Sequence, residues 1–182
     1  MTLKSWNDTP IKQAILDYVA AANDESSPDY VPPADRIAAF DNDGTLWVEQ
    51  PAPAQTAMLV NKLVEQVKAD PSLAAVDPYK GIITQDPVFL QGVAQQVPEA
   101  IMAFLSGVGK AWEGATPEEY EAEARAYLAT SMHPRWDCPW TDLIYLPMLE
   151  LFDLLRENEW RVFVCSGGGR DFMRVFSEEA LG

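Results

Sequence analysis

Residues 36–47 read RIAAFDNDGTLW and place two acids directly after an apolar run. Ile37 to Phe40 has the length and composition of a short buried strand. Asp41-Asn42-Asp43-Gly44-Thr45 follows, and its glycine marks a turn. We expect this strand to deliver two carboxylates, two residues apart, into a loop at its carboxyl end.

Composition sets the broad class of the protein. Of the 182 residues, 48% are hydrophobic, and there are six tryptophans, which favours a packed globule over a disordered chain. The formal net charge of -15 disfavours the basic stripe that nucleic acids and anionic membranes require, so we expect no nucleic acid partner and no membrane partner. No apolar leader and no stretch of membrane-spanning length occurs, so the predicted location is the cytoplasm.

The order of elements predicts an α/β fold with a helical insertion. We expect a helix, a strand, a helical insert, a helix, a strand, a glycine loop and a helix at residues 10–22, 36–41, 51–139, 143–157, 160–165, 166–169 and 170–180. This is a βαβ framework split by an insert. The predicted domains are therefore a core of residues 1–50 and 140–182 and a helical domain of residues 51–139. Cys165, in the second strand, is expected to be a small buried side chain.

Two loops follow the two expected strands, and both carry groups suited to phosphate chemistry. Ligands of parallel sheets bind beyond the carboxyl ends of the strands, so we expect Asp41 and Asp43 to face Ser166-Gly167-Gly168-Gly169. Two adjacent carboxylates favour a hard cation such as Mg2+, and one acid can attack phosphorus while the other transfers protons. The serine and glycines have the form of an anion cradle. The alternatives are an ordinary surface turn and a flexible glycine loop.

These residues resemble the haloacid dehalogenase superfamily of phosphohydrolases. Asp41-Asn42-Asp43-Gly44-Thr45 after an apolar strand matches the family's first motif, and Ser166 after Val162-Phe163-Val164-Cys165 matches its second. The resemblance implies a Rossmann-like α/β core with a helical cap of the first type inserted between the motifs. Residues 133–169 are also similar to a bacterial branch of phosphoserine-phosphatase-like hydrolases.

The resemblance implies roles for individual residues. Asp41 would be the nucleophile that forms an aspartyl-phosphate, and Asp43 would be the general acid and base. The Asp41 carboxylate and the Asp43 backbone carbonyl would hold Mg2+. Dehalogenases lack the second acid and the metal, so Asp43 favours phosphoryl transfer, and a closing cap favours a small phosphorylated metabolite as substrate. The residues expected at the phosphate are Asn42, Gly44, Thr45, Ser166 and Gly167.

The sequence departs from the family pattern after Ser166. The family's third motif supplies a lysine and its fourth supplies an acid or acid pair for the Mg2+ shell, and neither motif follows Ser166 here. We interpret the sequence as a truncated product: a fragment, a cleavage product or a shortened gene. The open sheet edge at Arg36–Asp41 would allow pairing with a second copy of the chain.

Three functions are open on the sequence alone. The leading prediction is Mg2+-dependent hydrolysis of a small phosphomonoester through an aspartyl-phosphate. The main alternative is a catalytically inactive remnant that serves as an interaction or oligomerisation domain. The third is a serine esterase built on Ser166 and His133, the single histidine, for which the sequence implies no orienting acid.

Overall fold

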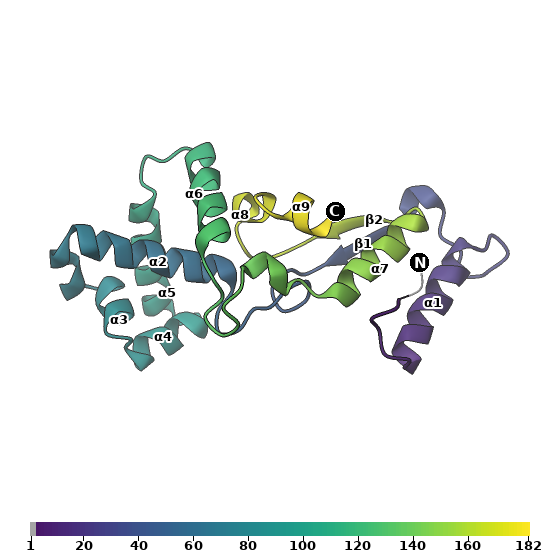
Figure 1. Ribbon diagram of the computed structural model, residues 1–182, viewed down its shortest axis with the longest axis horizontal. Coiled ribbons are helices and arrows are strands. Elements are labelled where there is room, and N and C mark those ends of the chain that lie inside the picture. Colours follow the sequence, from purple (N-terminus) through teal and green to yellow (C-terminus); the bar gives the residue numbers. More distant parts are fainter. Residues whose placement is uncertain (1–2) are drawn as a thin grey trace. The chain divides into compact units, whose positions relative to one another are not determined.

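The computed structural model describes residues 3–182 and has a mixed α/β fold that is mostly helical. The predicted α/β class is confirmed. The chain divides into two compact units, one formed by Met1–Pro51 and Ser131–Gly182 and the other by Ala52–Thr130. Both strands that the structure describes belong to the first unit (Figure 1).

The first unit contains two strands and a set of helices, of which η1 and η3 are 3₁₀ helices. In chain order they are α1 (Pro10–Asn23), η1 (Pro33–Asp35), β1 (Ile37–Phe40), η3 (Trp140–Leu143), α7 (Leu146–Glu157), β2 (Arg161–Val164), α8 (Arg170–Arg174) and α9 (Ser177–Leu181). The single helix expected over residues 170–180 is wrong, because the chain breaks between α8 and α9. At the break, Phe176 has a φ of -126° and its side chain is buried.

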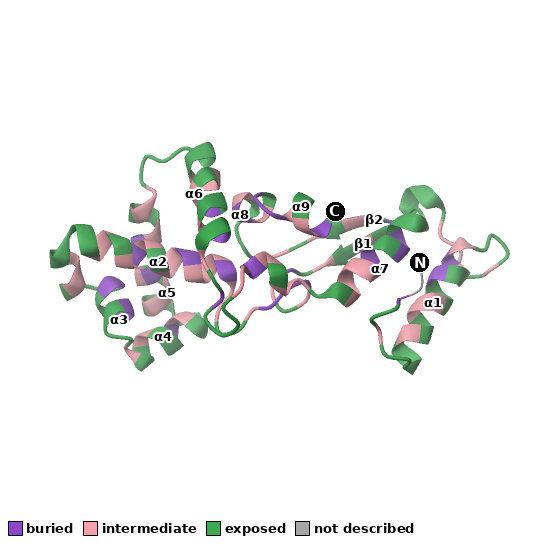
Figure 2. Cartoon of the chain, in the orientation of Figure 1, coloured by how far each residue is buried: buried purple, intermediate pink, exposed green. Residues whose placement is uncertain are grey.

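The two strands pair in parallel, as expected for neighbours in a βαβ unit. Ile37 lies opposite Arg161, and Phe40 lies opposite Val164. One face of the sheet packs against a core formed by α1, α7 and their flanking residues. The prediction that the strands are buried is half wrong, because alternate side chains on the other face are exposed (Figure 2). Ile37 and Phe163 are 52% and 48% exposed.

The same exposed face corrects the prediction for Cys165. Its side chain was expected to be buried, but Cys165 is an exposed free thiol. Side chains of a strand alternate between its two faces, and Cys165, which directly follows β2, lies on the same face as the exposed Phe163. It therefore points away from the side covered by α7. An apolar sequence run therefore did not guarantee burial on both faces of this sheet.

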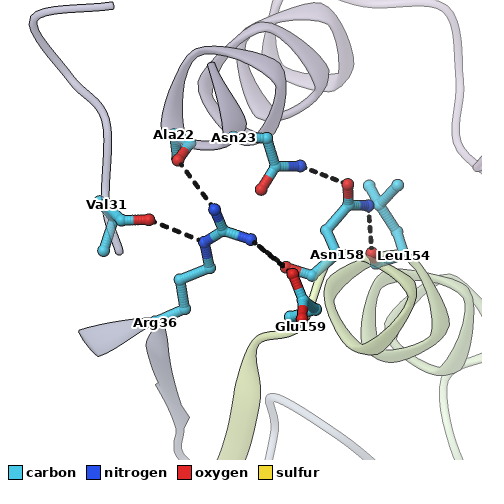
Figure 3. A network of polar contacts seen from close by, with 7 residues as sticks. All are labelled: Ala22, Asn23, Val31, Arg36, Leu154, Asn158 and Glu159. Atoms are coloured by element: carbon cyan, nitrogen blue, oxygen red, sulfur yellow. Dashed lines mark hydrogen bonds and ion pairs between the residues drawn. The ribbon is translucent and has the colours of Figure 1, made fainter. Parts of the chain in front are cut away.

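A buried arginine ties α1 to the start of β1 and to the end of α7 (Figure 3). The Arg36 guanidinium donates to the carbonyl oxygens of Val31 at 2.9 Å, Asn158 at 3.1 Å and Ala22 at 3.5 Å. It also lies 3.4 Å from the carboxylate of Glu159. Arg36, the residue directly before β1, is therefore held by hydrogen bonds to three separate segments of the chain.

The second unit is entirely helical within its described residues. Its elements are α2 (Ala54–Ala69), η2 (Pro71–Ala75), α3 (Tyr79–Ile83), α4 (Pro87–Ala94), α5 (Pro98–Ala111) and α6 (Pro117–Thr130). All of these elements lie within residues 51–139, where a helical insert was expected. Their core centres on Leu63, Tyr79, Ile82 and Phe104. The helical insert is thus observed.

The boundary between the units lies at Ser131 rather than at residue 140. Residues 131–139 join the first unit because the wholly buried His133 ring packs against Trp136 and Trp140, each 4.5 Å away between ring centroids. Its Nε2 lies 2.8 Å from the carbonyl oxygen of Gln50.

No helix within residues 3–182 is long and apolar enough to cross a bilayer by itself. The α4 and α5 helices meet the hydropathy criterion only as a pair that is bent by 90°.

Candidate functional site

The two loops identified in the sequence leave the sheet side by side. The backbone N–H of Cys165 donates to the carbonyl oxygen of Phe40 at 2.7 Å, which is the last bond of the ladder. Because Asp41 follows Phe40 and Ser166 follows Cys165, the two loops begin side by side. This arrangement brings the first acid and the serine to the same carboxyl edge of the sheet, as predicted.

The acidic loop is a tight turn closed by backbone hydrogen bonds. The N–H groups of Thr45 and Leu46 both donate to the carbonyl oxygen of Asn42, at 3.1 and 2.8 Å. The N–H of Gly44 donates to the carbonyl oxygen of Trp47 at 3.0 Å, and Gly44 has a φ of +72°. The turn thus depends on a glycine in the left-handed region.

The two acids of the turn have different surroundings. Asp41 is exposed, and its Oδ1 accepts from the backbone N–H of Asn42 at 2.8 Å. Asp43 is half-buried, and its Oδ1 accepts from the indole Nε1–H of Trp47 at 2.8 Å. Asp41 is therefore open to a ligand, whereas Asp43 is anchored by one of its two oxygens.

Burial raises the pKa of the Asp43 carboxyl above its usual value, and the negative charges of Asp41 and Glu49 act in the same direction. The Trp47 hydrogen bond opposes this shift but does not cancel it. A carboxyl whose pKa is raised holds its proton closer to neutral pH, which is what a general acid requires. Asp43 is therefore better suited than an ordinary aspartate to donate a proton.

This environment predicts how stability depends on pH. Because the pKa of Asp43 is higher in the folded state, the native chain binds more protons than the unfolded chain between the ordinary and the raised pKa. Stability is then lost as the pH rises through that window. We expect Asp43→Asn to raise the thermal midpoint above that of wild type at about pH 7, with the difference vanishing towards about pH 3.

A second aspartate provides a control of opposite sign. Asp24 accepts from the side chain and the backbone N–H of Ser26, and these bonds lower its pKa. Asp24→Asn should therefore lower the thermal midpoint at neutral pH. A thermal midpoint of Asp43→Asn at or below that of wild type at neutral pH would contradict the unfavourable environment inferred for this carboxylate.

The carboxylate of Glu49 lies close to Gly44. A Cβ added at Gly44 would lie 2.7 Å from Cδ of Glu49 and 2.9 Å from its Oε1. The end of the Glu49 side chain can move aside, but the left-handed backbone at Gly44 opposes any side chain. We therefore expect Gly44→Ala to reduce the free energy of unfolding by about 1–3 kcal/mol. Urea denaturation measures this change.

Gly109 is the matched control for the Gly44 substitution. It lies within α5, where an added Cβ would meet no atom within 4 Å. Gly109→Ala should raise the free energy of unfolding by about 0.5–1 kcal/mol, since alanine loses less conformational freedom in a helix. Equal effects at the two positions would show that the turn does not need glycine.

The serine loop is more open than the acidic loop. Ser166 is half-buried, and its Oγ accepts from the N–H of Gly168 at 3.0 Å. An added Cβ at Gly167 would meet no atom within 4 Å, so no steric contact explains this glycine. The helix that follows, α8, has only five residues, which weakens the helix contribution expected for an anion cradle.

A cavity of about 510 Å³ lies along β2 and reaches this loop. Ser166, Gly168, Arg170 and Arg174 are among its lining residues. The acidic turn, residues 41–45, is not part of that lining. The structure therefore brings Asp41 and Ser166 to one sheet edge, and this cavity takes in the serine loop but not the acidic turn.

Oxygen donors in the acidic turn fit Mg2+ in part. Mg2+ binds proteins through one or two carboxylates and keeps water and substrate oxygens as its other ligands. Asp41 offers an exposed carboxylate, and Oδ1 of the buried Asn42 has no hydrogen-bond partner in the described chain. Within residues 3–182, no three Asp, Glu, His or Cys side chains gather as a metal-binding group. The fit is to a partly hydrated ion and not to a cage built of protein ligands.

His133 is not placed to activate Ser166. Its Nε2 is engaged with the carbonyl oxygen of Gln50, and its Nδ1 accepts from the backbone N–H of Arg135 at 3.1 Å. With both ring nitrogens occupied inside an aromatic cluster, the ring has a structural role. This arrangement removes the base that a serine esterase would need.

Two contributors to the site were missed by sequence reasoning. Trp47 directly follows the acidic turn in the sequence, but the motif does not predict its bond to Asp43. Glu49 is half-buried, and its carboxylate lies against Gly44. The sequence does contain a signal for the Trp47 contact, which is a tryptophan four residues after an acid in a glycine turn.

Comparisons with known proteins add no family assignment. No family model matches the chain, and no curated protein matches it.

Proposed function

We propose that this chain carries the nucleophile and phosphate-binding elements of a haloacid dehalogenase-type phosphohydrolase. The reaction is Mg2+-dependent hydrolysis of a small phosphomonoester through an aspartyl-phosphate. The proposal is supported by the resemblance of Asp41-Asn42-Asp43-Gly44-Thr45 and Ser166 to the family's first two motifs. In this proposal the second unit is the family's cap.

One observation carries the proposal beyond the motif. The two aspartates that follow β1 differ in their surroundings, in the way that a nucleophile and a general acid require. Asp41 is exposed, whereas Asp43 is half-buried with a raised pKa and one anchored oxygen. Environments that push the pKa values of neighbouring carboxyls apart are the usual basis for separating acid and nucleophile roles.

The reaction has two steps. A carboxylate oxygen of Asp41 attacks phosphorus, the bond from phosphorus to the leaving oxygen breaks, and Asp43 gives its proton to that oxygen. Water then attacks the phosphorus of the aspartyl-phosphate, and Asp43 takes a proton from this water. The bond from phosphorus to the Asp41 oxygen breaks, which releases phosphate and restores Asp41.

The phosphoryl group also needs donors and charge compensation. Ser166 Oγ–H and the Gly167 N–H are the proposed donors to a phosphoryl oxygen, and the loop of Asn42, Gly44 and Thr45 surrounds the phosphate. Bound Mg2+ would supply positive charge at the reacting phosphoryl group, with Asp41 and the Asp43 carbonyl as its protein ligands. Arg170 and Arg174 line the same cavity as Ser166 and are the proposed source of further positive charge.

Metal removal tests the proposed function. With p-nitrophenyl phosphate as the probe, EDTA should abolish hydrolysis and added Mg2+ should restore it, because the charge on the phosphoryl group is otherwise uncompensated. The measurement is the initial rate of nitrophenol release as Mg2+ is titrated back.

The other outcomes of this assay are equally informative. Hydrolysis that persists in EDTA would overturn the proposal. Turnover of p-nitrophenyl acetate without metal would favour an esterase instead. No turnover of the phosphomonoester at any Mg2+ concentration would favour a non-catalytic protein.

A second candidate function is interaction with another copy of the chain. It is favoured by the uncovered sheet face, on which Ile37 and Phe163 are about half exposed, and by the free edge of β1 in the described two-stranded sheet. Light scattering over a range of protein concentrations tests it. A constant monomer mass at all concentrations would remove this candidate.

A further inference from the structure

Trp47 uses its single polar atom on the second acid of the turn. The residue is 1% exposed, and its Nε1–H donates to Oδ1 of Asp43 at 2.8 Å. Two other buried tryptophans, Trp140 and Trp160, have Nε1 atoms with no hydrogen-bond partner in the described chain. A buried indole in this fold therefore does not need a partner in order to pack, and the bond to Asp43 is a specific feature of Trp47.

The Trp47 ring is itself held in place. It stacks on Phe176, with ring centroids 4.3 Å apart and planes 15° apart. Phe176 in turn meets the edge of Phe172 at 6.0 Å. The Trp47 carbonyl oxygen also accepts from Gly44 N–H. The indole is thus fixed by the turn on one side and by the segment after the serine loop on the other.

We propose that Trp47 is a positioning residue that orients the Asp43 carboxyl for proton transfer. Its N–H holds Oδ1, which leaves Oδ2 as the oxygen that exchanges a proton with the leaving group or with water. The aromatic stack makes this orientation depend on Phe176, which follows the serine loop in the chain. The inference rests on the proposed function, because Asp43 acts as acid and base there.

Trp47→Phe separates the hydrogen bond from the packing. Phenylalanine keeps a ring against Phe176 but removes the N–H. We expect kcat for p-nitrophenyl phosphate to fall about tenfold to a hundredfold with KM within about twofold, since a misplaced catalytic group slows chemistry more than binding. Trp160→Phe is the matched control, because it loses the same atoms from a buried indole that makes no bond, and its kcat should equal that of wild type.

A measurement that needs no turnover distinguishes this inference from the proposed function. The three-bond couplings to Asp43 Cγ report its side-chain rotamer in solution. We expect one rotamer in wild type and in Trp160→Phe, and averaged rotamers in Trp47→Phe. If this pattern is found but wild type hydrolyses no phosphomonoester, the anchoring stands and the proposed function fails.

Other results overturn the inference. It fails if Trp47→Phe leaves both the Asp43 couplings and kcat unchanged, or if kcat falls while the couplings stay fixed. Should Trp47→Phe not fold, Asp43→Asn gives the answer in its place. That substitution should shift the indole N–H resonance of Trp47 and leave those of Trp140 and Trp160 in place, and no shift at Trp47 would refute the bond.

Discussion

Replacing Asp41 by asparagine is expected to abolish Mg2+-dependent phosphomonoester hydrolysis, with a loss in kcat of about 10⁴-fold or more. The amide has nearly the same shape as the carboxylate, but it is a poor nucleophile and a weak Mg2+ ligand. Asp41 is exposed, and within residues 3–182 its side chain accepts a hydrogen bond from the N–H of Asn42 alone, so the fold should change little. Initial rates at saturating substrate and Mg2+ measure the loss.

Asp35→Asn is the control for this substitution. Asp35 is an exposed acid in η1, just before β1, and it lies outside the proposed site. Its variant should keep the wild-type kcat, which shows that the loss at Asp41 does not come from a general change in charge. An Asp41→Asn protein that retained more than about a tenth of the wild-type kcat would exclude Asp41 as the nucleophile.

Local sequence patterns predicted the elements of the site well. The apolar run before Asp41 forms β1, and the run before Ser166 forms β2. Both patterns depend on neighbouring residues, and the parallel pairing then follows from the βαβ rule. The positive φ of Gly44 also follows from local chemistry, because a turn of this kind favours glycine at that position.

The environment of each acid could not be predicted from the motif. Asp41 and Asp43 are chemically identical and two residues apart, yet one is exposed and the other is half-buried. The difference comes from Trp47 and from its stacking partner Phe176, which lies far along the sequence. A pattern of neighbours does not contain such a contact, so the inequality of the two carboxyls emerges only in three dimensions.

Contacts between residues far apart in the sequence also explain why the predicted burial of β2 and the predicted helix over residues 170–180 were wrong. Val162 and Phe163 are both apolar neighbours in β2, but only Val162 packs against the core that includes α7. Which face of a strand is covered depends on the elements packed against the sheet, and hydrophobicity alone does not encode it. The predicted helix over residues 170–180 failed for a related reason, since the buried Phe176 interrupts it.

The largest expected effect on stability is at Arg36, which the sequence presented only as a charged residue before an apolar strand. Replacing it by methionine should lower the free energy of unfolding by about 3–5 kcal/mol. Methionine can fill much of the volume, but it cannot donate to the carbonyl oxygens of Val31, Asn158 and Ala22. The carbonyl oxygens of Val31 and Asn158 are partly buried, and loss of the Arg36 donor costs about 1–3 kcal/mol for each. The Ala22 carbonyl oxygen costs less, because it still accepts from the N–H of Val31.

Two control substitutions identify the source of this stabilisation. Arg161→Met removes an exposed arginine that makes one bond from its side chain, to the carbonyl oxygen of Ala34, and should cost about 1 kcal/mol or less. Glu159→Gln removes the ionic partner of Arg36, but the Glu159 side chain is 70% exposed, so solvent screens the pair and the cost should be about 0.5 kcal/mol or less.

Urea denaturation at low salt decides between two explanations of the buried arginine, because urea does not screen the ion pair. If the carbonyl bonds dominate, Arg36→Met loses far more stability than Glu159→Gln. If the ion pair dominates, the two losses are similar. Arg36 directly precedes β1, and Asp41 directly follows the same strand, so loss of these bonds should also loosen the acidic turn. Faster amide exchange at Asn42 and Gly44 in Arg36→Met, but not in Arg161→Met, would establish that connection.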